Sequence, residues 1–301
     1  MFSREPRARA ELILFFVTFI WGSTFVLTKE LLSAFSPFAY IGTRFALASA
    51  IFAILFPASV RKMNAPGALR GSILGVLLFA GFVLQTIGLQ YTTASKSAFI
   101  TGMLVVFTPL WQVALERRFP SLGTLLGVVL VTVGLFFLTS PDGSGFNRGD
   151  AMTLGCAFLF GLYIVLLDIF GKEADAGQLT VMQFVISAIG GGMAMLFFED
   201  ARLVLTLGAV LELGYLAVAA SVVALYLQTK YQPDTTPARS AVIFSLEPVI
   251  AAVLAYVVMG ELLGLLGALG GGLILAGLLF SQLSDRFFGA QSGGTDSAPG
   301  M

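Results

Sequence analysis

The sequence predicts an all-α polytopic membrane protein, with ten transmembrane helices arranged as two inverted five-helix repeats. Three observations predict this class. The 301 residues are 57% hydrophobic and only 11% charged, with a mean hydropathy of +0.93, whereas soluble domains carry about 25% charged residues. Apolar stretches long enough to cross a hydrocarbon core of about 30 Å recur along the chain. A polar motif from the first half returns in the second.

The apolar stretches are predicted to be ten spans, separated by turn-forming residues. They cover residues 10–30, 37–58, 70–90, 94–116, 121–140, 149–170, 179–198, 206–229, 238–259 and 262–282. Signals such as Ser36-Pro37, Phe119-Pro120 and Gln232-Pro233-Asp234 stand between them. Because these separating segments are short, we expect the activity to lie in the helical bundle. The first span is too long for a signal peptide, and residues 284–301 are predicted to be a disordered tail.

The basic residues predict that both termini are cytoplasmic. With that orientation, the segments inside the cell contain twelve Lys and Arg residues and the outside segments contain four. The inside set is Arg4, Arg7, Arg9, Arg61, Lys62, Arg70, Arg117, Arg118, Lys172, Lys230, Arg239 and Arg286, and the outside set is Lys29, Lys96, Arg148 and Arg202. Cytoplasmic loops of membrane proteins carry such an excess of positive charge.

The charge and residue counts exclude several function classes. Seventeen basic residues balance seventeen acidic ones, so no net charge favours nucleic acid as a partner. Histidine is absent and Cys156 is the single cysteine, which removes the commonest metal ligand and general base. No Walker A pattern occurs. We therefore expect no enzyme, no catalytic residues, no metal and no cofactor. The expected partners are a small-molecule substrate and the lipid bilayer.

An internal repeat divides the predicted spans into two sets of five. The run Thr92-Thr93-Ala94-Ser95-Lys96-Ser97-Ala98 recurs in the second half as Thr235-Thr236-Pro237-Ala238-Arg239-Ser240-Ala241. A half with five helices crosses the membrane an odd number of times, so the second copy must enter from the opposite side. Inverted pairs of this kind are typical of carriers that alternate between inward-open and outward-open states. A channel remains less favoured because nothing resembles a selectivity filter.

Polar residues within the spans are the candidate substrate path. On the fourth span, Ser97, Thr101, Thr108 and Gln112 share one helix face. They either line a watery path or form hydrogen bonds to backbone and neighbouring helices. The residues predicted to line the path are Trp21, Thr24, Gln85, Ser97, Thr101, Tyr163 and Glu247. For Gln85 and Tyr163 an interhelical hydrogen bond is the alternative.

Charged residues and prolines inside the spans receive separate predictions. Glu247 lies deep in the ninth span beside Pro248, where a charge is costly and usually marks a path or relay. Pro109 and Pro248 are predicted to break their helices. Lys96 and Arg239 oppose the helix dipole in the first turns of their helices, which makes them a candidate gate or headgroup contacts. Arg44 is expected to pair with loop carbonyls or a carboxylate such as Glu30.

Several motifs resemble a known transporter family. The run Trp21-Gly22-Ser23-Thr24-Phe25-Val26, followed by Lys29, Pro37 and Arg44, is similar to the opening of an EamA domain of the drug/metabolite transporter (DMT) superfamily. Ser245-Leu246-Glu247-Pro248, Gly260-Glu261 and the glycine-rich last helix resemble the close of a second copy. The copies would be residues 10–140 and 149–283. They differ where Phe160-Gly161 replaces Trp21-Gly22 and where Glu116-Arg117-Arg118 replaces Gly260-Glu261.

The resemblance implies a function. The nearest type within the superfamily is the YddG-type bacterial amino-acid exporter of the inner membrane. It implies a secondary carrier that exports amino acids, aromatic ones included, and similar small metabolites by alternating access. A proton-coupled exporter of drugs or other metabolites is the alternative. Because Glu247 is the only deep carboxylate and histidine is absent, we expect uncoupled transport, and we expect the chain to function as a monomer.

Overall fold

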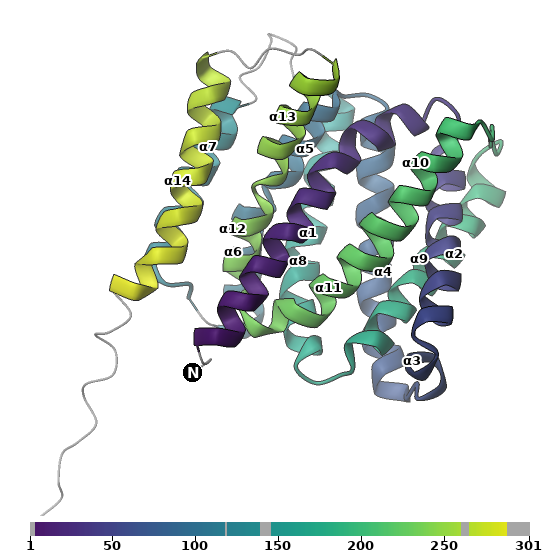
Figure 1. Ribbon diagram of the computed structural model, residues 1–301, viewed down its shortest axis with the longest axis horizontal. Helices are drawn as coiled ribbons and strands as arrows, with labels where there is room; N and C mark the ends of the chain where they lie inside the picture. The colour runs from purple at the N-terminus through teal and green to yellow at the C-terminus, as the bar shows by residue number, and fades with distance from the viewer. Residues whose placement is uncertain (1–3, 118, 139–145, 260–264, 288–301) are drawn as a thin grey trace, which may run out of the picture.

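The chain folds into helices that cross one another within a single bundle (Figure 1). A computed structural model describes residues 4–117, 119–138, 146–259 and 265–287. In these ranges the only strand-like contact is an isolated antiparallel bridge between Phe35 and Leu203. The predicted all-α class is therefore confirmed for the part of the chain that the structure describes.

The first half of the chain begins with long helices and ends with shorter ones. They are α1 (Arg4–Leu31), α2 (Pro37–Leu55), α3 (Pro57–Arg61), α4 (Ala65–Leu89), α5 (Ala94–Gly102), α6 (Leu104–Glu116) and α7 (Leu122–Leu138). Proline occupies the first turn of α2, α3 and α4, where its missing N–H costs no helical hydrogen bond. The short helix α3 begins at the end of the predicted span 37–58 and continues into the segment predicted to separate that span from the next.

The second half contains more irregular turns than the first. It contains α8 (Arg148–Gly171), α9 (Ala176–Phe198), α10 (Leu207–Ala217), the π-helical turn η1 (Val218–Val223), α11 (Ala224–Tyr231), the 3₁₀ turn η2 (Gln232–Asp234), α12 (Pro237–Phe244), α13 (Glu247–Met259) and α14 (Leu265–Phe287). Residues 284–287, predicted to belong to a disordered tail, continue α14. The rest of that predicted tail, residues 288–301, lies outside the described residues, as does the motif Gly260-Glu261.

Eight helical stretches in the described residues have the length and hydropathy of a membrane span. They are Glu5–Leu31, Pro37–Leu55, Ala65–Leu89, Ala94–Glu116, Arg148–Gly171, Ala176–Phe198, Leu207–Asp234 and Pro237–Leu254. They coincide with eight of the ten predicted spans. The helices α7, with 17 residues, and α14 occupy the positions of the other two. The chain is thus a multi-pass membrane protein.

Two of the predicted continuous spans are each broken into a pair of helices. The helices α5 and α6 meet at Met103, and α12 and α13 meet at Ser245 and Leu246. At both points the backbone tightens, since the amide of Met103 donates to the carbonyl of Ile100 and the amide of Leu246 donates to that of Ile243, each at 3.1 Å. In Figure 1, α5 and α13 lie in the upper half of the bundle and α6 and α12 in the lower half.

The prolines differ in their relation to these breaks. Pro248 is the second residue of α13, directly after the break, so its missing amide falls where a helix lacks amide partners anyway. Pro109, in contrast, lies inside α6, well beyond the break at Met103. The prediction that Pro109 breaks its helix is therefore wrong. The break follows Gly102 instead, and glycine weakens a helix interior by about 1 kcal/mol relative to alanine.

The packing is densest where aromatic rings or glycines meet. Phe45 and Phe52 of α2 contact Phe82 of α4 and Phe184 of α9, with ring centroids 5.1 Å and 5.7 Å apart for the pairs Phe45–Phe82 and Phe52–Phe184. The helix α7 packs along α14 and α2 packs along α9. The pair α7–α14 lies on one side of α1, α4 and α8, and the pair α2–α9 lies on the other side (Figure 1).

Glycines bring α7 and α14 into direct backbone contact at two points. A Cβ atom at Gly134 would lie 2.7 Å from the carbonyl oxygen of Gly270, and one at Gly277 would lie 2.9 Å from that of Gly127. Close approach through small residues is a main source of helix association in lipid. Both contacts therefore require glycine.

We expect Gly134→Ala to destabilise the protein, because the added methyl group meets backbone atoms that have little freedom to move. The expected loss is about 1–3 kcal/mol, as for other overpacked sites. Thermal unfolding in detergent measures it. The matched control is Gly272→Ala on α14, where an added Cβ meets nothing within 4 Å. Equal unfolding temperatures for the two variants would contradict the role of the Gly134 contact.

Candidate functional site

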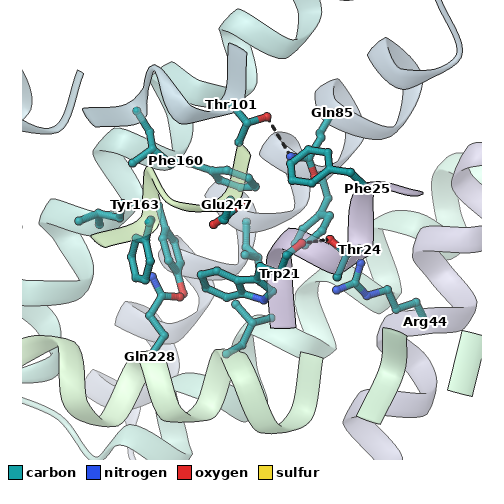
Figure 2. A pocket seen from close by; sticks show the side chains of 16 residues that line it. Trp21, Thr24, Phe25, Arg44, Gln85, Thr101, Phe160, Tyr163, Gln228 and Glu247 are labelled. Atoms are coloured by element: carbon teal, nitrogen blue, oxygen red, sulfur yellow. Dashed lines mark hydrogen bonds between the residues drawn. The ribbon is translucent and has the colours of Figure 1, made fainter. Parts of the chain in front are cut away.

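A cavity of about 60 Å³ lies at the centre of the bundle (Figure 2). Residues from both halves of the chain form its wall, and the two helix breaks lie beside it. The lining residues are Trp21, Thr24, Phe25, Arg44, Leu78, Phe82, Gln85, Thr101, Leu104, Phe160, Tyr163, Ile164, Leu225, Gln228, Phe244 and Glu247. Aromatic rings make up much of the wall, and polar groups interrupt it at a few points. This composition is typical of sites that bind small organic molecules.

Six of the seven residues predicted to line a path meet at this cavity. They are Trp21, Thr24, Gln85, Thr101, Tyr163 and Glu247. The seventh, Ser97, does not reach the wall: it is fully buried within α5, and its hydroxyl oxygen has no hydrogen-bond partner among the described residues. Sequence reasoning missed Phe25, Phe82, Phe160 and Gln228, and it gave Arg44 a different role.

The π-helical turn η1 positions Trp21. In this turn the amide of Ala224 donates to the carbonyl of Ala219, five residues back, which leaves the carbonyl of Ala220 without its α-helical partner. The indole Nε1 of Trp21 donates to that carbonyl at 3.0 Å. Single π turns inside α-helices often occur at functional sites, and here the turn fixes the indole ring against Phe244, with centroids 5.4 Å apart.

The same turn holds Arg44 in the cavity wall. The Nε atom of Arg44 donates to Ser221 Oγ at 2.8 Å, and Nη1 donates to the hydroxyl of Tyr40 at 2.6 Å. Its guanidinium carbon lies 4.7 Å from the ring centroid of Phe82, a cation–π contact. The expected pairing with loop carbonyls or Glu30 is wrong, because one turn of α2 separates Tyr40 from Arg44 and points the guanidinium inward.

Glu247 is the acidic group of the cavity. It is the first residue of α13 and only 8% exposed. Within the described residues its carboxylate makes no hydrogen bond and no ion pair. Figure 2 shows it facing the space between Tyr163, Trp21 and Thr101. A buried carboxylate without a partner is costly in a membrane protein, so this group is suited to bind a proton or a cationic part of a solute.

Two further polar residues of the wall, Gln85 and Tyr163, form hydrogen bonds to side chains of other helices. Gln85 Nε2 donates to Thr101 Oγ1 at 3.1 Å, and the hydroxyl of Tyr163 donates to Gln183 Oε1 at 2.6 Å. Thr108 donates to the backbone carbonyl of Leu104 at 2.8 Å. Both interpretations of the polar stripe therefore hold in part: Thr101 lines the cavity, whereas Thr108 satisfies its own helix.

The cavity residues fall into pairs at two constant sequence separations. The shorter separation, from Trp21 to Phe160, also relates Thr24 to Tyr163 and Phe25 to Ile164. The longer separation is that of the repeated motif, from Thr92 to Thr235, and it relates Phe82 to Leu225, Gln85 to Gln228, Thr101 to Phe244 and Leu104 to Glu247. Of the sixteen lining residues, only Arg44 and Leu78 lack a paired residue in the wall. The wall is therefore lined by positions that recur at constant sequence separations, and most of the paired positions carry different side chains.

Two ion pairs are also related by these two sequence separations. Lys96 Nζ lies 2.7 Å from Asp150 Oδ2, and Thr92 Oγ1 donates to the same carboxylate at 2.8 Å. Arg239 Nε lies 2.6 Å from Glu11 Oε1, and Thr235 Oγ1 donates to that oxygen at 3.1 Å. The two cations are related by the longer separation and the two carboxylates by the shorter one.

These ion pairs join the first turn of a broken helix to a long helix. Thr93 caps α5 by accepting from the Lys96 amide, and Thr236 caps α12 by accepting from the Arg239 amide. Because α5 starts at the upper end of the bundle and α12 at the lower end (Figure 1), the two ion pairs lie at opposite ends.

Comparison with known sequences gives one family. The profile described as "EamA-like transporter family" matches residues 8–140 and again residues 147–283. An "Uncharacterized transporter" of Archaeoglobus fulgidus is 33% identical over 92% of this chain and 87% of its own length. An "S-adenosylmethionine/S-adenosylhomocysteine transporter" of Chlamydia trachomatis is 27% identical over 61% of this chain and 60% of its own length.

Comparison with solved structures supports the fold. One crystal structure superposes with a TM-score of 0.79, covering 93% of this chain and 99% of the other, at 18% sequence identity. At that identity the likeness concerns the fold alone.

We expect Lys96→Met to destabilise the protein, because it leaves the fully buried Asp150 carboxylate without its cation. The expected loss is about 1–3 kcal/mol, below the roughly 3–5 kcal/mol of fully buried pairs, since the Lys96 side chain is 23% exposed. Thermal unfolding of Lys96→Met and of the double variant Lys96→Met/Asp150→Asn measures the coupling, and the double variant should recover part of the loss.

Arg70→Met, which removes the exposed pair with Glu173, is the control and should change stability by less than about 1 kcal/mol. Additive effects in the double variant would contradict a coupled pair.

Proposed function

Because the chain belongs to the EamA-like transporter family, we propose that it is a secondary carrier of the cell inner membrane that exports amino acids and similar small metabolites. The solute binds in the central cavity, and the carrier opens this cavity to each side of the membrane in turn. The observation that carries the proposal is the composition of the cavity wall, in which aromatic rings surround one buried carboxylate and one buried guanidinium group.

Ten spans in two inverted repeats are part of this proposal. The double match of the family profile and the pairing of cavity residues at two constant separations both support two repeats. Their boundaries are residues 10–140 and 149–283. The helix α7 has 17 residues, at the lower limit of the length that spans a bilayer. Counting α7 and α14, each repeat has five spans, and the second enters the membrane from the opposite side.

The orientation follows from the distribution of basic residues. The excess of twelve Lys and Arg residues over four supports cytoplasmic termini. The loop at Asp142–Gly145, which this topology puts outside the cell, lies beyond the described residues. We also propose that the chain functions as a monomer, since residues from both of its halves meet around one cavity within the chain.

The substrate class follows from the chemistry of the cavity wall. An α-amino acid carries an ammonium group that complements Glu247 and a carboxylate that complements Arg44. The rings of Trp21, Phe160 and Phe244 favour an aromatic or apolar side chain. The named relative of Chlamydia trachomatis adds support, because S-adenosylmethionine is an amino acid that carries an aromatic base.

The two ion pairs are suited to act as gates. Lys96–Asp150 and Arg239–Glu11 lie at opposite ends of the broken helices. In the described structure both pairs are formed, and the cavity between them is small. Opening one pair at a time would expose the cavity to one side only, as alternating access requires.

Uncoupled transport follows from the small number of groups that could carry a proton. The chain has no histidine, and Glu247 is the single carboxylate in the cavity wall. If Glu247 binds the substrate ammonium, transport runs down the amino-acid gradient. The alternative is a proton-coupled exporter of drugs or other metabolites, in which Glu247 exchanges a proton during the cycle.

We expect Thr101→Phe to abolish transport, because the ring fills a cavity of only about 60 Å³. Uptake of labelled amino acids, including L-tryptophan, into proteoliposomes measures the loss. Thr132→Phe on α7 is the control, since Thr132 bonds to its own helix and lines no part of the cavity. Full activity of Thr101→Phe would remove the cavity from the substrate path.

We expect Glu247→Gln to slow amino-acid transport by about tenfold or more, since losing a charge-assisted contact costs about 1.5–3 kcal/mol. The expected loss is equal with and without an imposed pH gradient. Exchange and gradient-driven accumulation in proteoliposomes separate the two roles. A variant that loses accumulation but retains exchange would show that Glu247 couples transport to protons, and the facilitator proposal would then fail.

A further inference from the structure

A second cavity, of about 230 Å³, lies at the α12 end of the bundle. The end of α6, the start of α7, the end of α8 and the start of α12 surround it. By the same measure the central cavity is about 60 Å³, so the second cavity is nearly four times larger. In the described conformation, the second cavity is therefore the one with room for a solute.

The wall of this second cavity carries charges of both signs. Lys172 and Arg239 supply positive charge, and Asp168 and Glu116 supply negative charge. Lys172 Nζ lies 2.6 Å from Asp168 Oδ2, and Arg239 is held by Glu11. Although Lys172 and Arg239 already pair within the protein, a wall that carries charges of both signs and no net charge offers partners to both the ammonium and the carboxylate group of a zwitterion.

Gln112 adds a polar group that the protein itself leaves unsatisfied. Its side chain lines the cavity and is only 7% exposed. Its carboxamide oxygen has no hydrogen-bond partner among the described residues. A buried acceptor without a donor costs about 1–3 kcal/mol, and the amide can turn about its broad terminal torsion to meet a donor. An ammonium group in the cavity supplies that donor.

The second cavity and the central cavity share three helical segments. On α8, Ile164 lines the central cavity and Asp168 lines the second, one turn further on. On α6 the corresponding residues are Leu104 and Gln112. Arg239 of α12 precedes Glu247 of α13 by about two helical turns, so the same pattern recurs there. The two cavities therefore follow one another along the same helical segments.

At the opposite end of the bundle, a lysine side chain occupies the position equivalent to Asp168. Lys29 of α1 corresponds to Asp168 of α8 by the shorter separation, the one that also relates Trp21 to Phe160. Its ammonium group donates to the carbonyls of Leu89 and Thr92 at 2.5 Å and 2.8 Å. There the side chain of Lys29 satisfies two backbone carbonyls, whereas at the α12 end the carboxamide oxygen of Gln112 has no partner among the described residues.

We propose that the second cavity is a loading site that binds a zwitterionic α-amino acid before it moves to the central cavity. This inference rests on the proposed function for the identity of the ligand. Arg239 forms part of both the wall and the adjacent ion pair with Glu11. Binding at this site therefore places the solute directly against the cation of that ion pair.

The test measures protection of an introduced cysteine. Ser121 lines the second cavity and is exposed, while the native Cys156 is fully buried, so Ser121→Cys supplies the reactive thiol. The probe is L-tryptophan, and the readout is the rate of maleimide labelling of the purified full chain in nanodiscs. At tenfold excess over its dissociation constant, L-tryptophan should slow labelling about tenfold by mass action. Glu173→Cys, an exposed position outside the cavity wall, is the control and should label at an unchanged rate.

Two further variants separate direct binding from indirect effects. In the Thr101→Phe background, where the central cavity is filled, protection of Ser121→Cys should persist. Adding Gln112→Leu, which keeps the size but removes the amide, should weaken protection. Protection that disappears with Thr101→Phe, or that also occurs at Glu173→Cys, would overturn the loading site.

Transport measured in the same preparations distinguishes this inference from the proposed function. Transport of L-tryptophan without protection of Ser121→Cys would overturn the loading site and leave the carrier proposal intact. Protection in both backgrounds without transport of any amino acid would support the second cavity as a binding site and overturn amino-acid export.

Discussion

The structure of this chain depends on one constraint: its buried polar groups must find hydrogen-bond partners within the protein. Within a bilayer a backbone carbonyl or a charged side chain has no water to bond with, so the protein has to supply the partner. The π turn η1 does so twice, because its freed Ala220 carbonyl accepts from Trp21 and its Ser221 hydroxyl accepts from Arg44. One departure from regular helix thus orders two sides of the central cavity. Glu247 is the charged group of the wall for which the described residues supply no hydrogen bond and no ion pair, and this makes it the chemically distinctive point of the wall.

The two halves of the chain meet this requirement with the same backbone and different side chains. Threonine caps α5 and α12 in the same way, and a basic residue three positions later pairs with a carboxylate in both cases, the Asp150 side chain being fully buried and the Glu11 side chain 14% exposed. The reciprocal contacts of Gly134 with Gly270 and of Gly277 with Gly127 repeat the pattern. Equivalent positions in the first helix of each half are related by the shorter sequence separation, and those in the later helices by the longer one. The second half therefore has extra residues between its first helix and its later helices, enough for about one helical turn.

The sequence was a good guide to helices and to the residues of the central cavity, and a poor guide to their partners. Hydropathy located the spans because lipid imposes one length scale, and polar spacing located Trp21, Gln85 and Thr101 because a polar face avoids lipid. The rotation of each helix depends on packing, which is why Ser97 falls outside the wall and why Gln228, equivalent to Gln85, was missed. Nothing in the local sequence of Val218–Val223 signals a π turn, so the anchoring of Arg44 could not be foreseen. The break at Met103 follows Gly102, and Pro109 lies inside a continuous helix. This too was not predictable, because the effect of a proline depends on whether the neighbouring helices tolerate a continuous helix.

The pairing of Leu104 with Glu247 has an energetic consequence for the empty protein. In the proposed inverted repeat, exchanging the inward-open and outward-open conformations would exchange the surroundings of equivalent positions. If Leu104 and Glu247 were the same residue, the two conformations would be close to equal in energy at this point. With a carboxylate on one side only, the conformation that hydrates Glu247 is the more stable one, and a difference of about 1.4 kcal/mol already gives a tenfold excess in population. Under the proposed inverted repeat, the unmatched Glu247 would therefore give the chain a resting preference that a chain with identical residues at these two positions would lack.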